Sequence, residues 1–93
     1  MEEKLRAHLM ISGRVQGVCY RIETKFAAER IGACGWVRNK RDGRVEAMVE
    51  GTRQQVEALI DWCRIGPPAS RVHDVEVSWE PFQGEFGSFD VTY

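Results

Sequence analysis

The spacing of apolar residues changes along this 93-residue chain, and the order of those changes restricts the possible folds more than any other feature. Residues 5–12 alternate apolar and polar side chains, which is the pattern of a strand with one buried face. From about residue 20 the apolar residues recur at helical intervals, and Gly32 provides a stop signal. The expected helical stripe comprises Ile22, Phe26, Ala27 and Ile31. The first third of the chain therefore predicts a strand followed by a helix.

The middle of the chain predicts a hairpin. Trp36 and Val37 open a short strand, and residues 39–43 end in Asp-Gly, a pair that tolerates the positive φ angles of hairpin turns. The alternation of a strand then resumes at Val45, Ala47 and Val49.

The second helix has the clearest local signals. Thr52 can cap its N-terminus, and Gln55 three residues later completes the pattern of a capping box. Apolar positions with helical spacing follow, and the Gly-Pro-Pro segment 66–68 ends them. These positions are Val56, Leu59, Ile60 and Cys63. Two more strands are expected around residues 75–79 and 89–93.

These elements predict a single domain over residues 1–93, of the α+β class. The order β-α-β-β-α-β with an additional C-terminal strand is typical of a ferredoxin-like sandwich. Two helices would cover one face of a mostly antiparallel sheet, and strands one and two would run in the same direction. Aromatic residues are expected to pack in the core and at the sheet edges, namely Trp36, Trp79, Phe86, Phe89 and Tyr93.

Composition argues against several classes of partner. The formal net charge is −1 and charges of both signs are interleaved, which disfavours nucleic acid or an anionic membrane. No apolar run reaches the roughly 18–20 residues of a membrane span, and the charged N-terminal segment does not resemble a signal peptide. Cys19, Cys34 and Cys63 form neither a disulfide framework nor a zinc-ligand pattern. We expect a cytoplasmic protein with no metal and no cofactor.

One edge of the predicted sheet gathers residues suited to an anion. The loop from Gly13 to Cys19, the helix start near Arg21 and the strand exit at Asn39 should meet there. A tight loop that enters a helix can turn backbone N–H groups inward, and the helix dipole reinforces such a site. The guanidinium of Arg21 offers a fork of donors matched to two phosphate oxygens. This edge therefore predicts a phosphoryl-binding site.

The residues at this edge resemble the paired signature of the acylphosphatase family. The first motif is Gly-Arg-Val-Gln-Gly-Val-Cys-Tyr-Arg at residues 13–21, and the second is Gly-Trp-Val-Arg-Asn at residues 35–39. The family often has Gly and Phe where this chain has Cys19 and Tyr20. The likeness includes residues 42–46, residues 66–72 and the aromatic C-terminal strand, so it covers nearly the whole chain. Two spaced motifs on the expected elements are a stronger indication than a glycine-rich loop alone.

The resemblance implies a metal-independent hydrolase that cleaves the carboxyl–phosphate anhydride of a small-molecule acyl phosphate. Arg21 would bind the phosphate, Asn39 would position the attacking water, and loop amides would wrap the phosphate. That loop comprises Arg14, Val15, Gln16, Gly17, Val18, Cys19 and Tyr20. Neither motif contains a carboxylate or imidazole base, which suits a loose transition state in which positioning and charge carry most of the catalysis.

Other functions are compatible with the fold class. An RNA reader would need stacking aromatics and a basic face, and a metal chaperone would need paired cysteines; the chain has neither pattern. A regulatory acylphosphatase-like domain with weak hydrolysis is the other alternative, although a chain from Met1 to the final strand favours a free-standing monomeric enzyme. The acyl group stays open among acetyl phosphate, carbamoyl phosphate, 1,3-bisphosphoglycerate and protein aspartyl-phosphate. Cys19 is expected to be a small loop residue without a required role.

Overall fold

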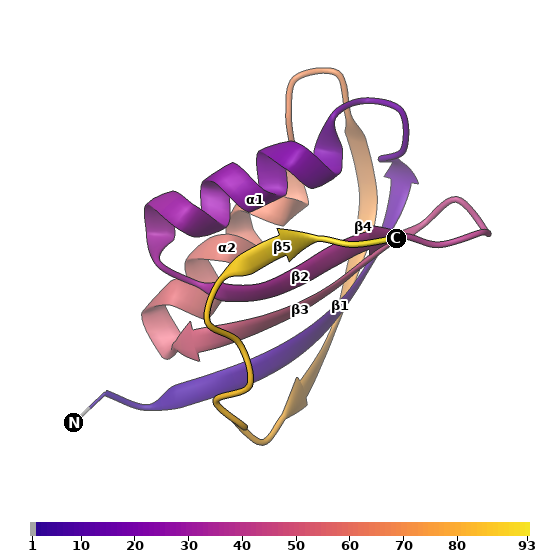
Figure 1. Cartoon of the computed structure of the whole chain (residues 1–93). Coiled ribbons are helices and arrows are strands. Elements are labelled where there is room, and N and C mark those ends of the chain that lie inside the picture. Colours follow the sequence, from indigo (N-terminus) through magenta and orange to yellow (C-terminus); the bar gives the residue numbers. More distant parts are fainter. Residues whose placement is uncertain (1) are drawn as a thin grey trace.

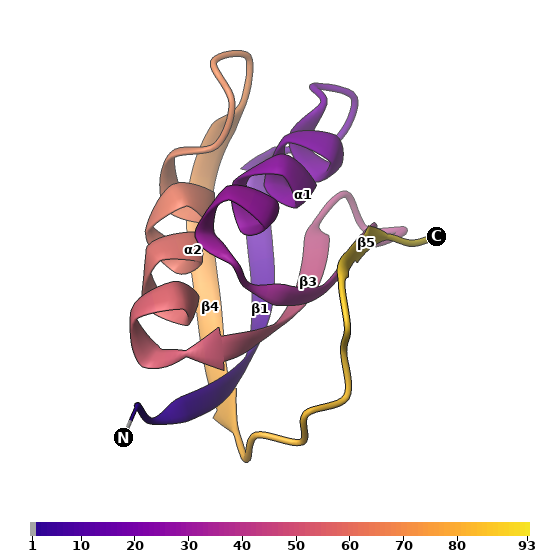
Figure 2. The ribbon, with the colours of Figure 1, turned by 60° about the vertical axis from the view of Figure 1, so that its left-hand side comes forward.

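The computed structural model describes residues 2–93 and confirms the ferredoxin-like α+β architecture (Figure 1). The elements in chain order are β1 (Lys4–Arg14), α1 (Tyr20–Ile31), β2 (Cys34–Asn39), β3 (Val45–Thr52), α2 (Arg53–Ile65), β4 (Arg71–Glu80) and β5 (Phe89–Val91). The strand order is β4-β1-β3-β2-β5, and neighbouring strands are antiparallel except for β2 and β5. Figure 2 shows both helices on one face of the sheet.

The core lies between the helices and the inner face of the sheet. Leu9 and Ile11 of β1 are fully buried, which confirms the alternation in residues 5–12. At the start of α2, Thr52 Oγ1 accepts a hydrogen bond from Gln55 N–H, and the Gln55 side chain accepts one from Thr52 N–H. The capping box is therefore confirmed. The apolar stripe of α2 is also buried as predicted, at Val56, Leu59, Ile60 and Cys63.

The predicted stripe of α1 is partly wrong. Ile22 and Phe26 are 40% and 43% exposed, and the buried face consists of Tyr20, Thr24, Ala27 and Ala28. The Tyr20 hydroxyl donates a hydrogen bond to the carbonyl of Cys63 on α2 (2.8 Å), which fixes how α1 is rotated. Thr24 can be buried because its hydroxyl donates to the Tyr20 carbonyl (2.7 Å). A contact between two helices thus decides which face of α1 is inside.

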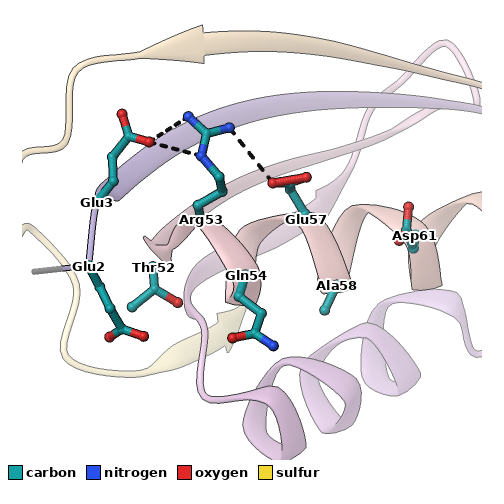
Figure 3. A pocket seen from close by; sticks show the side chains of 8 residues that line it. All are labelled: Glu2, Glu3, Thr52, Arg53, Gln54, Glu57, Ala58 and Asp61. Atoms are coloured by element: carbon teal, nitrogen blue, oxygen red, sulfur yellow. Dashed lines mark hydrogen bonds and ion pairs between the residues drawn. The ribbon is translucent and has the colours of Figure 1, made fainter.

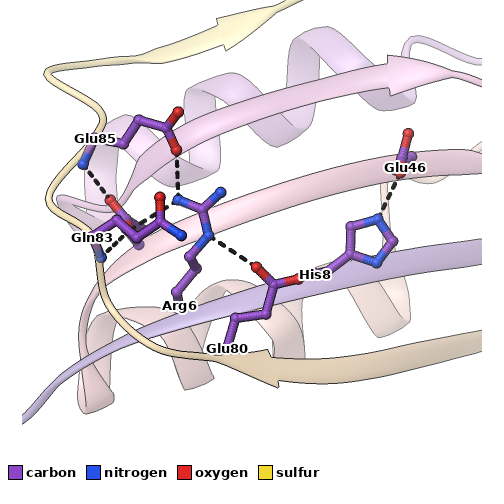
Figure 4. Close-up of polar contacts among 7 residues, drawn as sticks. Arg6, His8, Glu46, Glu80, Gln83 and Glu85 are labelled. Atoms are coloured by element: carbon purple, nitrogen blue, oxygen red, sulfur yellow. Dashed lines mark hydrogen bonds and ion pairs between the residues drawn. The ribbon is translucent and has the colours of Figure 1, made fainter.

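A buried ion pair on the helix-free face anchors the segment that connects β4 to β5. Glu50 of β3 accepts hydrogen bonds from the backbone N–H groups of Gln83 (2.8 Å) and Glu85 (3.0 Å) and from the guanidinium of Arg6 (3.2 Å). Arg6 also pairs with Glu80 and Glu85, and these groups surround it in Figure 4. Residues 81–88 are thereby held across this face and deliver β5 to the edge of β2.

The pKa of Glu50 reflects this anchoring. Burial alone would raise the pKa, but the two backbone N–H groups and the Arg6 guanidinium outweigh burial and hold it below the usual value for glutamate. A carboxyl whose pKa is lower in the folded than in the unfolded chain stabilises the fold above its unfolded pKa. That contribution is lost as the pH falls through the folded pKa.

Replacing Glu50 with glutamine should lower the free energy of unfolding at pH 7 by about 1.5–3 kcal/mol, because charge-assisted hydrogen bonds are lost. The variant should also lose less stability than wild type as the pH falls below about 4, the unfolded pKa range of glutamate. Urea unfolding at both pH values measures this. Glu57→Gln, at an exposed ion pair on α2, serves as the control and should change stability by less than about 1 kcal/mol. Equal losses in the two variants would contradict the anchoring role.

Candidate active site

The sheet brings the ends of β1 and β2 to the same edge. Both strands are antiparallel to β3, which lies between them, so they run in the same direction. Ile11 of β1 and Asn39 of β2 are both register partners of Val45. The loop after β1, the start of α1 and Asn39 therefore meet at one edge, as expected from the sequence.

An open pocket of about 460 Å³ lies at this edge. Its lining residues come from the loop, the start of α1, the end of β2 and the C-terminal segment: Val15, Gly17, Cys19, Tyr20, Arg21, Ile22, Asn39, Val91 and Tyr93. None of them is Asp, Glu or His. The structure thus places Arg21 and Asn39 in one pocket whose lining includes no acidic side chain.

The loop presents backbone N–H groups that have no protein acceptor. Within residues 2–93, the N–H groups of residues 16–19 donate to no backbone carbonyl. Cys19, the N-cap of α1, provides no capping hydrogen bond with its side chain. The loop turns through positive φ at Gly17 (73°) and Cys19 (63°), and Cys19 is the one non-glycine residue of the described chain with positive φ. Loop and helix start together form a cluster of free donors for an anion.

Arg21 carries a charge that no carboxylate neutralises. Its Nη1 donates a long hydrogen bond (3.4 Å) to the carbonyl of Thr92, and its guanidinium lies 5.1 Å from the ring centre of Tyr93. Within residues 2–93 no Asp or Glu lies at salt-bridge distance from it. The C-terminal segment therefore orients Arg21 and leaves its charge available.

Tyr93 departs from the expectation that it packs in the core or at a sheet edge. The residue is 95% exposed, and its ring makes a cation–π contact with the guanidinium of Arg21 beside the pocket. Trp79 is also largely exposed (52%), whereas Phe89 is buried as expected. The sequence offered no local signal for the contact between Tyr93 and Arg21, because 72 positions separate the two residues.

Asn39 has the most informative environment. Its side-chain oxygen Oδ1 is buried and has no hydrogen-bond partner among the described residues. Buried polar atoms in folded proteins almost always have a partner, so this acceptor calls for a water or ligand. The neighbouring Arg38 and Lys40 instead turn to Glu46, with Nε and Nζ at 2.7 and 3.9 Å from Oε1.

Glu46 therefore partly neutralises the cations that flank Asn39. Burial would raise its pKa, but hydrogen bonds with His8 and Arg38 outweigh burial and lower it. His8 Nε2 lies 2.6 Å from Glu46 Oε2, on the helix-free face (Figure 4). The ionised Glu46 thus binds Arg38 and Lys40 on the helix-free face at the end of β2, and Asn39 between them lines the pocket.

The predicted loop residues divide into two groups. Val15, Gly17, Cys19 and Tyr20 line the pocket, although the side chains of Val15 and Tyr20 are buried in the core. Burial, followed by the contact with Cys63, raises the pKa of Tyr20, whose hydroxyl stays protonated as a donor. The other predicted residues, Arg14, Gln16 and Val18, are not among the lining residues. Arg14 is exposed and pairs in register with Arg71 of β4.

A second hollow, of about 550 Å³, lies at the opposite edge of the sheet, at the start of α2 (Figure 3). It is lined by Glu2, Glu3, Thr52, Arg53, Gln54, Glu57, Ala58 and Asp61. This lining has four carboxylates and one arginine, so its net negative charge would repel a phosphoryl group. Within residues 2–93 no three His, Cys, Asp or Glu side chains are grouped to hold a metal ion, and no helix is long and apolar enough to cross a membrane.

Comparison with known proteins gives a consistent result. The family model described as acylphosphatase matches residues 7–91. An acylphosphatase from Anaeromyxobacter sp. (strain Fw109-5) is 54% identical over 93 residues, which cover both chains completely. One from Pyrobaculum arsenaticum is 54% identical over 90 residues, or 96% of this chain and 95% of the relative. The crystal structure of acylphosphatase from Bacillus subtilis superposes with a TM-score of 0.92 at 31% identity, covering 96% of this chain and 99% of that one.

The backbone of Cys19 should make this position sensitive to the shape of its side chain. A β-branched residue is disfavoured at positive φ, so Cys19→Val should lower the free energy of unfolding by about 1–2 kcal/mol. Asparagine tolerates this conformation, and Cys19→Asn should stay within about 0.5 kcal/mol of wild type. Urea unfolding measures both. The control Cys34→Val lies in β2, where a β-branched residue suits the strand. A Cys19→Val variant as stable as wild type would contradict the positive φ of Cys19.

Proposed function

The chain belongs to the acylphosphatase family, and on that premise we propose that Arg21 and the loop amides bind the phosphoryl group while Asn39 positions the attacking water. The reaction is hydrolysis of an acyl phosphate to a carboxylate and inorganic phosphate. The observation that carries the assignment of Asn39 is its buried Oδ1 without a partner among the described residues, on a residue that lines the same pocket as Arg21.

Phosphate binding follows from the charges and donors of the pocket. The free N–H groups of the loop and of the first turn of α1 surround an anion, and the helix dipole adds positive potential. Arg21 supplies the full positive charge and two parallel donors. These groups stabilise charge spread over the equatorial oxygens of a loose transition state, so the proposal requires no metal ion.

Asn39 acts as an acceptor and not as a base. A water that donates one hydrogen to Oδ1 can direct a lone pair at phosphorus. The water oxygen forms the new P–O bond, the bond to the acyl oxygen breaks, and the carboxylate leaves with that electron pair. The proton of the water passes to a phosphate oxygen. The carboxylate needs no proton, which fits a pocket without an acidic or imidazole side chain.

We also propose a cytoplasmic monomer that acts on small molecules. The interleaved charges and the net charge of −1 argue against nucleic acid as a partner, and the three free cysteines suit a reducing compartment. The proposed binding groups contact the phosphoryl group alone, so several acyl groups are compatible with this pocket.

Replacing Asn39 with alanine should lower kcat for benzoyl phosphate by about 10²–10³-fold, the usual cost of losing one positioned polar group. KM and the inhibition constant of inorganic phosphate should change little, because the substrate-binding groups stay in place. Steady-state kinetics and circular dichroism measure activity and folding. Gln54→Ala, on the exposed surface of α2, is the control and should match wild type. Wild-type kcat in a folded Asn39→Ala would exclude the water-positioning role.

Replacing Arg21 with alanine should raise the inhibition constant of inorganic phosphate by about 10- to 150-fold, the equivalent of one charge-assisted hydrogen bond. Arg21→Lys should recover only part of this, since lysine lacks the planar pair of donors. Assays with a chelator present should leave the wild-type rate unchanged. Arg30→Ala, in the last turn of α1, is the matched control. Unchanged phosphate inhibition in Arg21→Ala would refute the binding role.

A further inference from the structure

We propose that Gln16 is a positioning residue for Asn39, because its side chain ties the phosphate-binding loop to the hairpin that follows Asn39. This inference rests on the proposed function. The Gln16 amide nitrogen Nε2 donates to the carbonyls of Lys40 (2.7 Å) and Arg44 (2.9 Å). Lys40 follows Asn39 directly, and Arg44 lies on the other arm of the same hairpin.

The carbonyls of Lys40 and Arg44 belong to the same hairpin turn. Lys40 N–H donates to the Arg44 carbonyl (2.7 Å) and closes the neck of the hairpin, and Gly43 N–H donates to the Lys40 carbonyl (3.2 Å). A carboxamide has two N–H hydrogens, and here each has its own acceptor. Both hydrogens of the Gln16 amide are therefore bound to the hairpin turn. A side chain without a pair of neutral donors would lose this tether.

The sheet does not provide this connection by itself. β1 and β2 are separated by β3, and the pairings of β3 with both strands end at the rung of Val45. Beyond that rung β1 continues to Arg14 in pairing with β4, and the loop follows it, while the hairpin follows β2. Among residues 2–93, the two hydrogen bonds of Gln16 are the side-chain hydrogen bonds that join loop residues 15–19 to hairpin residues 39–45.

This tether joins the loop, which is proposed to bind the phosphoryl group, to the hairpin next to Asn39, which is proposed to position the water. The loop amides hold the phosphoryl group, and Asn39 holds the water that must approach phosphorus in line with the leaving oxygen. A misplacement of about 1 Å can lower a rate by about 10²-fold. Gln16 therefore sets the distance between the bound phosphoryl group and the positioned water, and its loss should affect kcat more than binding.

Gln16→Met tests this, because methionine has a similar length and no donors. We expect kcat for benzoyl phosphate to fall by about 10- to 100-fold, with the inhibition constant of inorganic phosphate changed by less than about 3-fold. Gln54→Met on the surface of α2 is the matched control. A kcat equal to wild type, or a phosphate inhibition constant that rises as much as kcat falls, would overturn the proposal.

A double-mutant cycle with Asn39→Ala separates positioning from general support of the fold. If Gln16 acts through Asn39, adding Gln16→Met to Asn39→Ala should lower kcat by less than about 3-fold more. Full additivity of the two effects on kcat would contradict the inference. Gln16→Asn keeps the amide but is one methylene shorter, so it cannot reach both carbonyls. It should lose less kcat than Gln16→Met. Should Gln16→Met not fold, Gln16→Asn takes its place in the double-mutant cycle.

The same variants distinguish the proposed function of Asn39 from the role of Gln16. Wild-type kcat in Asn39→Ala would overturn the proposed function of Asn39 and the role of Gln16 with it. An impaired Asn39→Ala together with a fully active Gln16→Met would overturn the role of Gln16 alone and leave the proposed function standing.

Discussion

The antiparallel pairing of β3 with both β1 and β2 is the interaction on which the rest of this molecule depends. It makes β1 and β2 run in the same direction, and both pairings with β3 end at the rung of Val45, beyond which β1 continues to Arg14 beside β4. The loop, the free N-terminus of α1 and Asn39 reach one edge for that reason alone. At the other end of β3, the buried carboxylate of Glu50 holds the segment that brings β5 and Tyr93 to the same pocket. The two ends of the central strand β3 therefore position different parts of the same pocket.

The sequence predicts the parts of this structure that depend on local interactions. The capping box at Thr52, the buried stripe of α2 and the alternation in β1 all follow from spacing within a few residues. The shared edge of Arg21 and Asn39 follows from strand order. The rotation of α1 could not be predicted, because it depends on the hydrogen bond between Tyr20 and Cys63, which are 43 positions apart. The contacts of Arg21 with Thr92 and of Gln16 with the hairpin have the same origin in tertiary packing.

Polar groups on the helix-free face of the sheet and polar groups at the pocket differ in whether they have partners. On the helix-free face Arg6, Glu50, Arg38 and Glu46 are all paired, and their charges are compensated within the chain. At the pocket, among the described residues, a guanidinium lacks a carboxylate, an amide oxygen lacks a donor and several N–H groups lack an acceptor. Of these groups Asn39 Oδ1 is buried, and an unsatisfied buried group costs about 1–3 kcal/mol. In the proposed mechanism a water satisfies this oxygen.

The contact between Arg21 and the C-terminal segment links the orientation of this arginine to a short edge element. Arg21 donates to the Thr92 carbonyl, and among the described residues the three-residue strand β5 that carries this segment pairs only with β2. An edge strand of this length opens with a smaller free energy than a central strand such as β3, which is paired on both sides. The C-terminal segment can therefore detach while the core stays folded, and each such opening releases the side chain of Arg21. Fraying of the last residues and global unfolding are thus two separate ways to lose the orientation of the arginine.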